Sequence, residues 1–167
     1  MRNNKYAFLD RDGTLIYEPQ DTYQIDSLEK LRLLPGAIKG LKFLQRRGYS
    51  LVMVTNQDGL GTPSFPKEDF EKPQQRLLEI LHDDGITFTD IFICPHFPTD
   101  NCDCRKPQTT LLHNLLANTT LDEVSFVCGD REGDMLLAKN LGVRSIAMKT
   151  NGNFYTAIKA YFEAIDE

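Results

Sequence analysis

The sequence predicts an α/β fold with a doubly wound, mainly parallel sheet, because short apolar runs alternate with amphipathic stretches along the chain. The runs are a few residues long and rich in Val, Ile, Leu or Phe, which is typical of strands buried on both faces. At 167 residues the chain has the common size of one domain, so we expect 1–167 to form a single domain.

The first predicted strand is the apolar run Tyr6–Leu9. A helix is expected after it between Pro35-Gly36, which suits a helix start, and Gly48, which suits a helix end. Apolar residues recur every three positions between these two signals and give the helix one apolar face. The apolar run 50–54 predicts the second strand.

The second helix is expected over about 66–84, where leucines line one side and Gly85 follows as a stop signal. The run 91–94 predicts the third strand. Pro107 suits the first position of a third helix, because that position needs no backbone N–H, and leucines recur after it at helical spacing.

The fourth strand is predicted at 125–128, and a helix over 133–141 is stopped by Gly142. A fifth strand at 145–148 and a terminal helix at 154–164 complete the pattern. The segments 17–33 and 95–105 lack periodicity, and loops of that length in a compact domain are often functional. Both follow a predicted strand, where doubly wound sheets place their ligand sites.

The composition is that of a globular chain, with 41% hydrophobic and 26% charged residues. The net charge of -5, without a run of like charges, argues against a nucleic-acid partner. No apolar stretch is long enough to span a bilayer, and residues 1–5 do not begin a signal peptide. We therefore expect a cytoplasmic protein with no membrane partner.

Two carboxylates, Asp10 and Asp12, stand at the end of the first predicted strand. Side chains two residues apart on an extended chain project to the same side, so the pair is costly unless a cation or proton shares it. Oxygen ligands of this kind suit Mg²⁺. The competing interpretation is an ordinary Asp-Gly turn, which this segment alone does not exclude.

Polar residues follow the other strands in the same way. Thr55 and Asn56 end the second strand and can bind phosphate oxygens without adding charge. Arg105 and Lys106 supply cations before a predicted helix start, and Asp130 follows the fourth strand. Each of these features alone is more often a turn, a solvated basic pair or a helix cap.

Together the strand ends carry Asp-x-Asp, Thr, Lys and Gly-Asp-x-x-x-Asp in that order, which resembles the haloacid dehalogenase-like (HAD) phosphatase superfamily over nearly the whole chain. The resemblance implies a Rossmann-like sheet, an active site at the carboxyl ends of the strands, and no large cap domain. It implies Asp10 as the nucleophile that forms an aspartyl phosphate, and Asp12 as the general acid and base. The Mg²⁺ ligands would be Asp10, the backbone carbonyl of Asp12, and Asp130, with Asp134 as the outer acid of the motif.

The resemblance also implies that Thr55 and Asn56 hold the transferring phosphoryl group, that Lys106 offsets negative charge on Asp10, and that Arg105 binds substrate. The carboxylates near Asp12 are expected to raise its pKa, as a general acid requires.

A cluster of thiols and an imidazole in 95–105 and the preceding strand predicts a structural Zn²⁺ site. The competing interpretation, a set of unrelated reduced thiols, fits less well because free Cys prefers apolar surroundings and this loop is polar. Cys128, within an apolar strand, is expected to be a core residue. The predicted ligands are Cys94, His96, Cys102 and Cys104.

A zinc loop that runs into Cys-Arg-Lys-Pro resembles one HAD branch, which contains histidinol-phosphate phosphatases and heptose 1,7-bisphosphate phosphatases. The strings at 10–16, 18–19, 55–62, 65–66 and 94–96 resemble the histidinol-phosphate group, and the heptose group's Gly-Ile-Ala-Arg-Gly-like string is absent. We therefore expect histidinol phosphate as the substrate, with Glu18, Asp21 and Asp58 as an acidic rim for its amine and imidazole. In bifunctional members an imidazoleglycerol-phosphate dehydratase domain follows, so we expect a detached domain or a monofunctional enzyme.

Two interpretations without hydrolysis remain at this point. A phospho-receiver domain also has a doubly wound sheet and uses Mg²⁺, an Asp, a Thr and a Lys-Pro, but its acidic pair and phosphoacceptor stand on different strands. A zinc-organised interaction module would leave the strand-end motifs unexplained.

Overall fold

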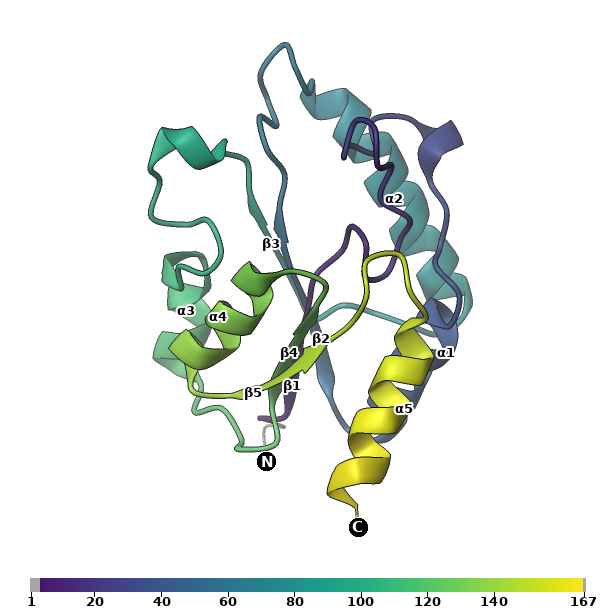
Figure 1. The fold of residues 1–167 in the computed structure, drawn as a ribbon, viewed down its shortest axis with the longest axis vertical. Coiled ribbons are helices and arrows are strands. Elements are labelled where there is room, and N and C mark those ends of the chain that lie inside the picture. Colours follow the sequence, from purple (N-terminus) through teal and green to yellow (C-terminus); the bar gives the residue numbers. More distant parts are fainter. Residues whose placement is uncertain (1–3, 167) are drawn as a thin grey trace.

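The computed structural model describes residues 4–166, so residues 1–3 of the N-terminal segment and Glu167 lie outside the described part. Its sheet has five parallel strands in the order β3-β2-β1-β4-β5. Figure 1 shows this sheet running through the centre of the molecule. The predicted doubly wound α/β fold is confirmed. The strands are β1 (Tyr6–Leu9), β2 (Ser50–Asn56), β3 (Asp90–Cys94), β4 (Phe126–Gly129) and β5 (Arg144–Ala147).

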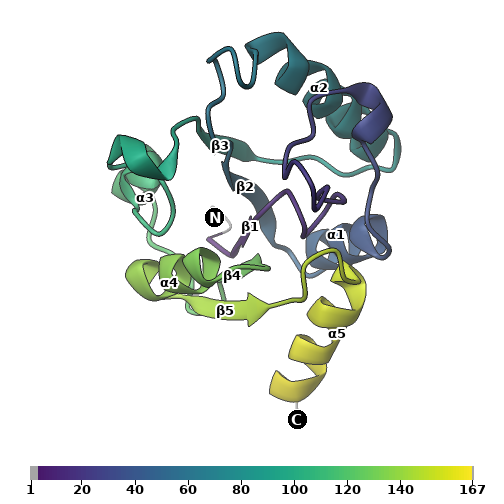
Figure 2. The ribbon, with the colours of Figure 1, turned by 45° about the horizontal axis from the view of Figure 1, so that its top comes forward.

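Helices cover both faces of the sheet, as Figure 2 shows, with α1, α2 and α5 on one side and α3 and α4 on the other. This division follows from the crossovers of a parallel sheet, which place each helix on a face. The helices are α1 (Ala37–Arg46), α2 (Lys67–Asp83), α3 (His113–Asn118), α4 (Glu132–Leu141) and α5 (Phe154–Ile165).

Alternate side chains of β1 point to opposite faces of the sheet and pack in two separate hydrophobic cores. Ala7 and Leu9 pack in the cluster with α1, α2 and α5, whereas Tyr6 and Phe8 pack in the cluster beneath α3 and α4. All four side chains are buried, so β1 is covered on both faces, as a continuous apolar run predicts. Cys128 is buried in the first of these cores, as expected.

The predicted start of the third helix at Pro107 is wrong. A 3₁₀ turn at Thr110–Leu112 leads into α3, which begins only at His113. The chain after Lys106 first makes a turn, because the Gln108 N–H donates to the carbonyl of Arg105 at 2.8 Å. The side chain of Asn140 in α4 donates to the Pro107 carbonyl at 2.9 Å and holds this turn in place.

The strand order places β1 in the centre, with β2 on one side and β4 on the other. The chain therefore winds in opposite directions from β1, and such a switch point opens a crevice at the carboxyl ends of the strands. The aperiodic segments 17–33 and 95–105 both reach this end of the sheet, because residues from each line the same pocket. Within residues 4–166, no helix combines the length and hydrophobicity that crossing a membrane requires.

Candidate active site

Strand β1 delivers Asp10 to the centre of the crevice. The Asp10 N–H donates to the Cys128 carbonyl at 3.1 Å, which extends the pairing of β1 with β4 by one residue. Asp10 and Asp12 both line the pocket, whereas Arg11 between them is fully buried beneath it. The two acids thus lie on the same side of an extended chain, as their spacing predicts.

The Lys106 side chain contacts residues from β2, from the end of β1 and from α4. Its Nζ lies 2.9 Å from Asp10 Oδ1, 2.8 Å from Asp134 Oδ1 and 2.8 Å from the carbonyl oxygen of Val54. Burial lowers the pKa of Lys106, but the charges of Asp10 and Asp134 outweigh it and raise that pKa above its ordinary value. Burial likewise raises the pKa of Asp10, but the Lys106 ammonium and hydrogen bonds to the Asp10 carboxylate together outweigh burial, so the pKa of Asp10 is lowered. The nucleophile candidate is therefore held ionised.

Three carboxylates, from Asp10, Asp130 and Asp134, come together with ligand oxygens within 4.8 Å of one another, and two of them, Asp10 and Asp134, line the pocket. Burial and the nearby Asp10 carboxyl raise the pKa of Asp130 to about 7. Burial and the charge of Asp10 raise the pKa of Asp134 to about 6. Such a cluster calls for a cation, and its oxygen-only donors fit Mg²⁺.

Threonine hydroxyls orient Asp130 from two loops. Thr150 Oγ1 donates to Asp130 Oδ2 at 2.8 Å, and Thr14 Oγ1 lies 3.3 Å from Asp130 Oδ1. Gly13 lies directly against this carboxylate, since a Cβ at that position would stand 2.5 Å from Asp130 Oδ2. Its φ of +83° also favours glycine. The Asp-Gly step after Asp12 therefore serves the acidic cluster as well as the turn.

Asp12 does not join the carboxylate cluster. Its Oδ1 accepts from Arg11 Nε at 2.6 Å, and its Oδ2 accepts from Gln57 Nε2 at 3.1 Å. Gln57 Nε2 also lies 2.8 Å from the Thr55 hydroxyl oxygen. The expectation that a crowd of carboxylates surrounds Asp12 is thus wrong, because a cation and an amide occupy both of its oxygens.

The predicted phosphate ligands lie at different depths. Thr55 is buried at the end of β2, whereas Asn56 lines the pocket and accepts from the Lys106 N–H at 3.1 Å through its Oδ1. Arg105 lines the outer pocket, where it pairs with Asp58 and donates to the His96 carbonyl at 3.2 Å. Arg105 therefore lies at the rim and not beside Asp10.

Glu18 also lines the pocket and is buried, and its carboxylate pairs with Arg131. Burial raises the pKa of Glu18, although the Arg131 charge opposes this. Asp58 and Glu18 thus lie at the pocket as the acidic-rim hypothesis requires, but each faces an arginine. Asp21 is not among the residues that line it. The pocket measures about 450 Å³ and is lined by Asp10, Asp12, Glu18, Thr22, Tyr23, Gln24, Asn56, Gln57, Asp58, Phe65, Phe97, Arg105, Lys106, Arg131, Gly133 and Asp134.

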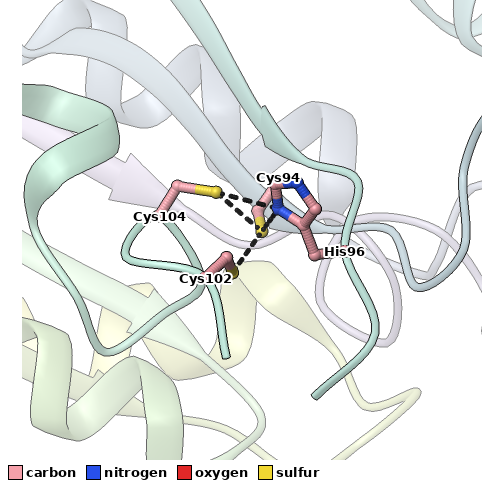
Figure 3. A group of neighbouring side chains, drawn as sticks. All are labelled: Cys94, His96, Cys102 and Cys104. Carbon is pink, nitrogen blue, oxygen red and sulfur yellow. Dashed lines mark hydrogen bonds between the residues drawn. The ribbon is translucent and has the colours of Figure 1, made fainter. Parts of the chain in front are cut away.

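The predicted zinc ligands converge at the end of β3, and Figure 3 shows their side chains pointing toward one another. Cys104 Sγ lies 3.1 Å from Cys94 Sγ and 3.2 Å from His96 Nδ1, and Cys102 Sγ lies 3.6 Å from Cys94 Sγ. Desolvation raises the pKa of Cys102, but the backbone N–H groups of Cys104 and Arg105 outweigh it and lower that pKa to about 7. Burial raises the pKa values of Cys94 and Cys104, so the fit to zinc rests on the ligands themselves: three thiols and one imidazole whose ligand atoms lie within 4.8 Å of one another suit a closed tetrahedral Zn²⁺ site.

The cysteine–histidine loop is joined to the active site by packing as well as by sequence. The ring of Phe97 lies so close to Gly59 that a Cβ there would stand 2.3 Å from Phe97 Cζ. Arg105 donates to His96 within the loop, and Lys106 follows directly. The loop therefore leads directly into Lys106, whose backbone N–H is bound by Asn56 and whose side chain reaches Asp10.

Comparison with known proteins agrees with this geometry. The family model described as "Polynucleotide kinase 3 phosphatase" matches residues 5–165. The chain belongs to this family of HAD-like phosphatases.

The proteins to which this phosphatase is similar include two curated relatives and one solved structure. "Histidine biosynthesis bifunctional protein HisB" of Campylobacter jejuni subsp. doylei is 57% identical over 145 residues, which cover 86% of this chain and 41% of the relative. The protein of the same name from Baumannia cicadellinicola is 45% identical over 165 residues, 98% of this chain and 46% of the relative. The phosphatase thus spans less than half the length of these relatives.

The solved structure is D,D-heptose 1,7-bisphosphate phosphatase from B. bronchiseptica, complexed with magnesium and phosphate. It has a TM-score of 0.77 and 26% sequence identity, and the match covers 93% of this chain and 86% of that chain. The likeness confirms the HAD-like fold and places the chain among phosphatases. The receiver-domain interpretation is not supported, since receiver sheets have the strand order 2-1-3-4-5.

Sequence reasoning assigned no role to several residues that the phosphatase brings to the site. Arg131 reaches Glu18 from the far end of the chain, and only the fold reveals this contact. The local sequence could have indicated a site role for Gln57, because it stands two residues after Thr55 and projects to the same side of an extended chain. It could also have indicated a role for Arg11, because a charged residue stands there between two acids at the end of an apolar strand.

Proposed function

We propose that this phosphatase hydrolyses L-histidinol phosphate to L-histidinol and phosphate through an aspartyl-phosphate intermediate on Asp10. The observation that carries the substrate assignment is the 57% identity with a histidine-biosynthesis protein, against 26% with the heptose bisphosphate phosphatase. The strings shared with histidinol-phosphate phosphatases support the same assignment.

In the first step, an oxygen of the Asp10 carboxylate attacks phosphorus, and the bond from phosphorus to the substrate's alcohol oxygen breaks. Asp12 gives its proton to the leaving oxygen. In the second step, water attacks the phosphorus of the acyl phosphate while Asp12 takes the proton, which releases phosphate and restores Asp10. A carboxylate nucleophile divides the hydrolysis into two easier displacements.

The charges at the site suit these steps. A phosphate monoester dianion repels Asp10, and Lys106 at 2.9 Å from Asp10 Oδ1 reduces that repulsion. The Thr55 hydroxyl and the Asn56 amide would bind the phosphoryl oxygens. Mg²⁺, held by Asp10, Asp130 and the backbone carbonyl of Asp12, would supply further charge neutralisation. Because Asp134 belongs to the same carboxylate cluster, it is a further candidate ligand, direct or through water.

A structural Zn²⁺ held by Cys94, His96, Cys102 and Cys104 would fix the loop that leads to Lys106. Thiolate and imidazole ligands select zinc, whereas the carboxylates select magnesium. The two metals therefore have separate tasks in the proposed enzyme.

The substrate's non-phosphate half would lie toward the rim, against Glu18 and the aromatic ring of Phe65 or Phe97. Besides the expected acids Glu18 and Asp58, the rim also contains two arginines. Arg105 and Arg131 each pair with an acid of the rim. An amine that takes the place of Arg131 beside Glu18 would preserve the charge balance of that pair.

The longer relatives fit a protein in which a second domain accompanies this one, and we propose an imidazoleglycerol-phosphate dehydratase domain as that partner. A biosynthetic step with reduced thiols as metal ligands fits a cytoplasmic location. The family description mentions polynucleotides, but the net charge of -5 does not favour nucleic acid as substrate.

The decisive experiment measures kcat/KM with Mg²⁺ for histidinol phosphate, heptose 1,7-bisphosphate and a 3′-phosphorylated oligonucleotide. We expect histidinol phosphate to exceed both others by at least roughly tenfold, the factor that one charge-assisted hydrogen bond provides. A preference for either alternative would overturn the substrate assignment and leave the aspartyl-phosphate mechanism standing.

A further inference from the structure

The side chain of Arg11 is fully buried, with 0% of its surface exposed, although it stands between the two acids of the proposed mechanism. It does not line the pocket, so it cannot touch the substrate. A buried guanidinium destabilises the fold unless its partners compensate for the lost hydration. The fold therefore retains this charge for a reason other than substrate binding.

Two residues of helix α2, Phe70 and Gln74, contact the guanidinium and together form what we call its seat. Arg11 Nη1 donates to Gln74 Oε1 at 2.9 Å, and the guanidinium carbon lies 4.8 Å from the centre of the Phe70 ring. Nη2 has no partner among the described residues, so the seat satisfies Arg11 only in part. An interaction that served stability alone would be better replaced by an apolar side chain.

The remaining donor of the fork, Nε, points at Asp12. It lies 2.6 Å from Asp12 Oδ1, and Gln57 Nε2 holds the other carboxylate oxygen at 3.1 Å. With both oxygens bound, the Asp12 carboxyl has one orientation. Contacts with α2 hold the far end of Arg11, so the hydrogen bond from Nε limits how the Asp12 carboxyl can turn.

We propose that Arg11 is a positioning residue that fixes the Asp12 carboxyl for proton transfer to the leaving group. The proposal rests on the proposed function, in which Asp12 is the general acid. Arg11 acts through Asp12 and contacts neither substrate nor metal.

The test compares Arg11→Met with wild type on a series of phosphate monoesters whose alcohols differ in pKa. Methionine keeps length and contact with Phe70 but donates no hydrogen bond. Alkyl phosphates need protonation of the leaving oxygen, whereas p-nitrophenyl phosphate does not. We expect kcat/KM to fall roughly ten- to hundredfold for alkyl phosphates, within the range of general acid catalysis, and less than about threefold for p-nitrophenyl phosphate.

Two further variants make the result specific. Arg76→Met removes an exposed arginine from the same helix, where Glu79 is its one ion-pair partner among residues 4–166, and should change neither rate. Gln74→Met weakens the seat while leaving Arg11 and Asp12 intact, and should produce the same selective loss at smaller size. If Arg11→Met does not fold, the selective loss in Gln74→Met carries the test.

The double variant of Arg11→Met with Asp12→Asn distinguishes the positioning role of Arg11 from the general-acid role of Asp12. Arg11→Met should add nothing to Asp12→Asn, because a positioning residue has no effect once its target is gone. Equal losses on all leaving groups, or additive losses in the double variant, would overturn the role of Arg11. If Asp12→Asn itself showed no dependence on the leaving group, the general-acid assignment would fail instead.

Discussion

Lys106 Nζ lies 2.9 Å from Asp10 Oδ1 although the two residues follow strands that are not neighbours in the sheet. Lys106 follows the loop after the edge strand β3, and its side chain passes over the end of β2, where it also contacts the Val54 carbonyl. The position of the lysine is therefore set by the loop that carries it. The nucleophile candidate depends on that loop for its charge balance.

Asp10→Asn should abolish turnover while the fold survives. The amide has nearly the same volume but is a far poorer nucleophile and metal ligand. Phosphate release should fall by roughly four orders of magnitude or more, as for loss of other covalent nucleophiles. The melting temperature should show that the variant is folded, and normal turnover in a folded variant would refute the mechanism.

The stability of the metal-free protein should depend on pH through Asp130, whose pKa is raised to about 7 from an ordinary 3.8. Between these values the unfolded chain has lost a proton that the folded protein still holds. The contribution of Asp130 is therefore complete below about pH 4 and is lost as pH rises through 7. Urea denaturation without added Mg²⁺ should show wild type losing stability relative to Asp130→Asn between about pH 5 and pH 8, a range that brackets the folded-state pKa.

Mg²⁺ should remove this loss, because the cation replaces the proton in the carboxylate cluster. Its stabilising effect should thus be larger at about pH 8 than at about pH 5. An effect of equal size at both pH values would mean that Asp130 does not hold the metal.

The protein should contain one tightly bound Zn²⁺ per chain besides an exchangeable Mg²⁺. Removal of zinc, or Cys102→Ser, should lower activity because the loop no longer fixes Lys106, and excess Mg²⁺ should not restore it. Thr99→Ser in the same loop is the matched control. Elemental analysis gives the zinc content, and zinc-free protein of full activity would contradict the role of the loop.

Gly13→Ala should impair Mg²⁺ binding, since the new methyl group would meet Asp130 Oδ2 at 2.5 Å. Gly85→Ala is a useful comparison because Gly85 also has a positive φ, +76°, but a methyl group there would have nothing within 4 Å. Both variants should lose about 1 kcal/mol from backbone strain. Only Gly13→Ala should raise the Mg²⁺ concentration needed for half-maximal activity, and equal behaviour would exclude the steric explanation.

Glu18→Gln should raise KM for histidinol phosphate by roughly ten- to hundredfold, the value of one charge-assisted hydrogen bond, and leave p-nitrophenyl phosphate nearly unchanged. The neutral amide cannot balance the charge of the substrate amine that takes the place of Arg131. Asp21→Asn is the control, because Asp21 does not line the pocket. Equal losses on both substrates would assign Glu18 to the phosphate site or to the fold.

Residues whose roles depend on local pattern could be predicted from the sequence. The acids at the end of β1 and the zinc ligands at the end of β3 are close together in sequence, and the order of the strand-end motifs along the chain assigned their chemistry. The pairing of Arg131 with Glu18 spans 113 positions and has no local signal. The late start of α3 has no local signal either, because leucine periodicity does not reveal the turn at Gln108, which depends on contacts with α4.

The contact between Lys106 and Asp10 also bears on how the chain folds. Asp10, Lys106 and Asp134 are far apart in sequence, and no short fragment contains all three. Closing loops of this length is slow because it costs chain entropy. The stabilising contacts among these three residues form only when the central strands are already paired. Recovery of phosphatase activity during refolding should thus lag behind the formation of helices, and a nascent chain that ends before β4 should be inactive.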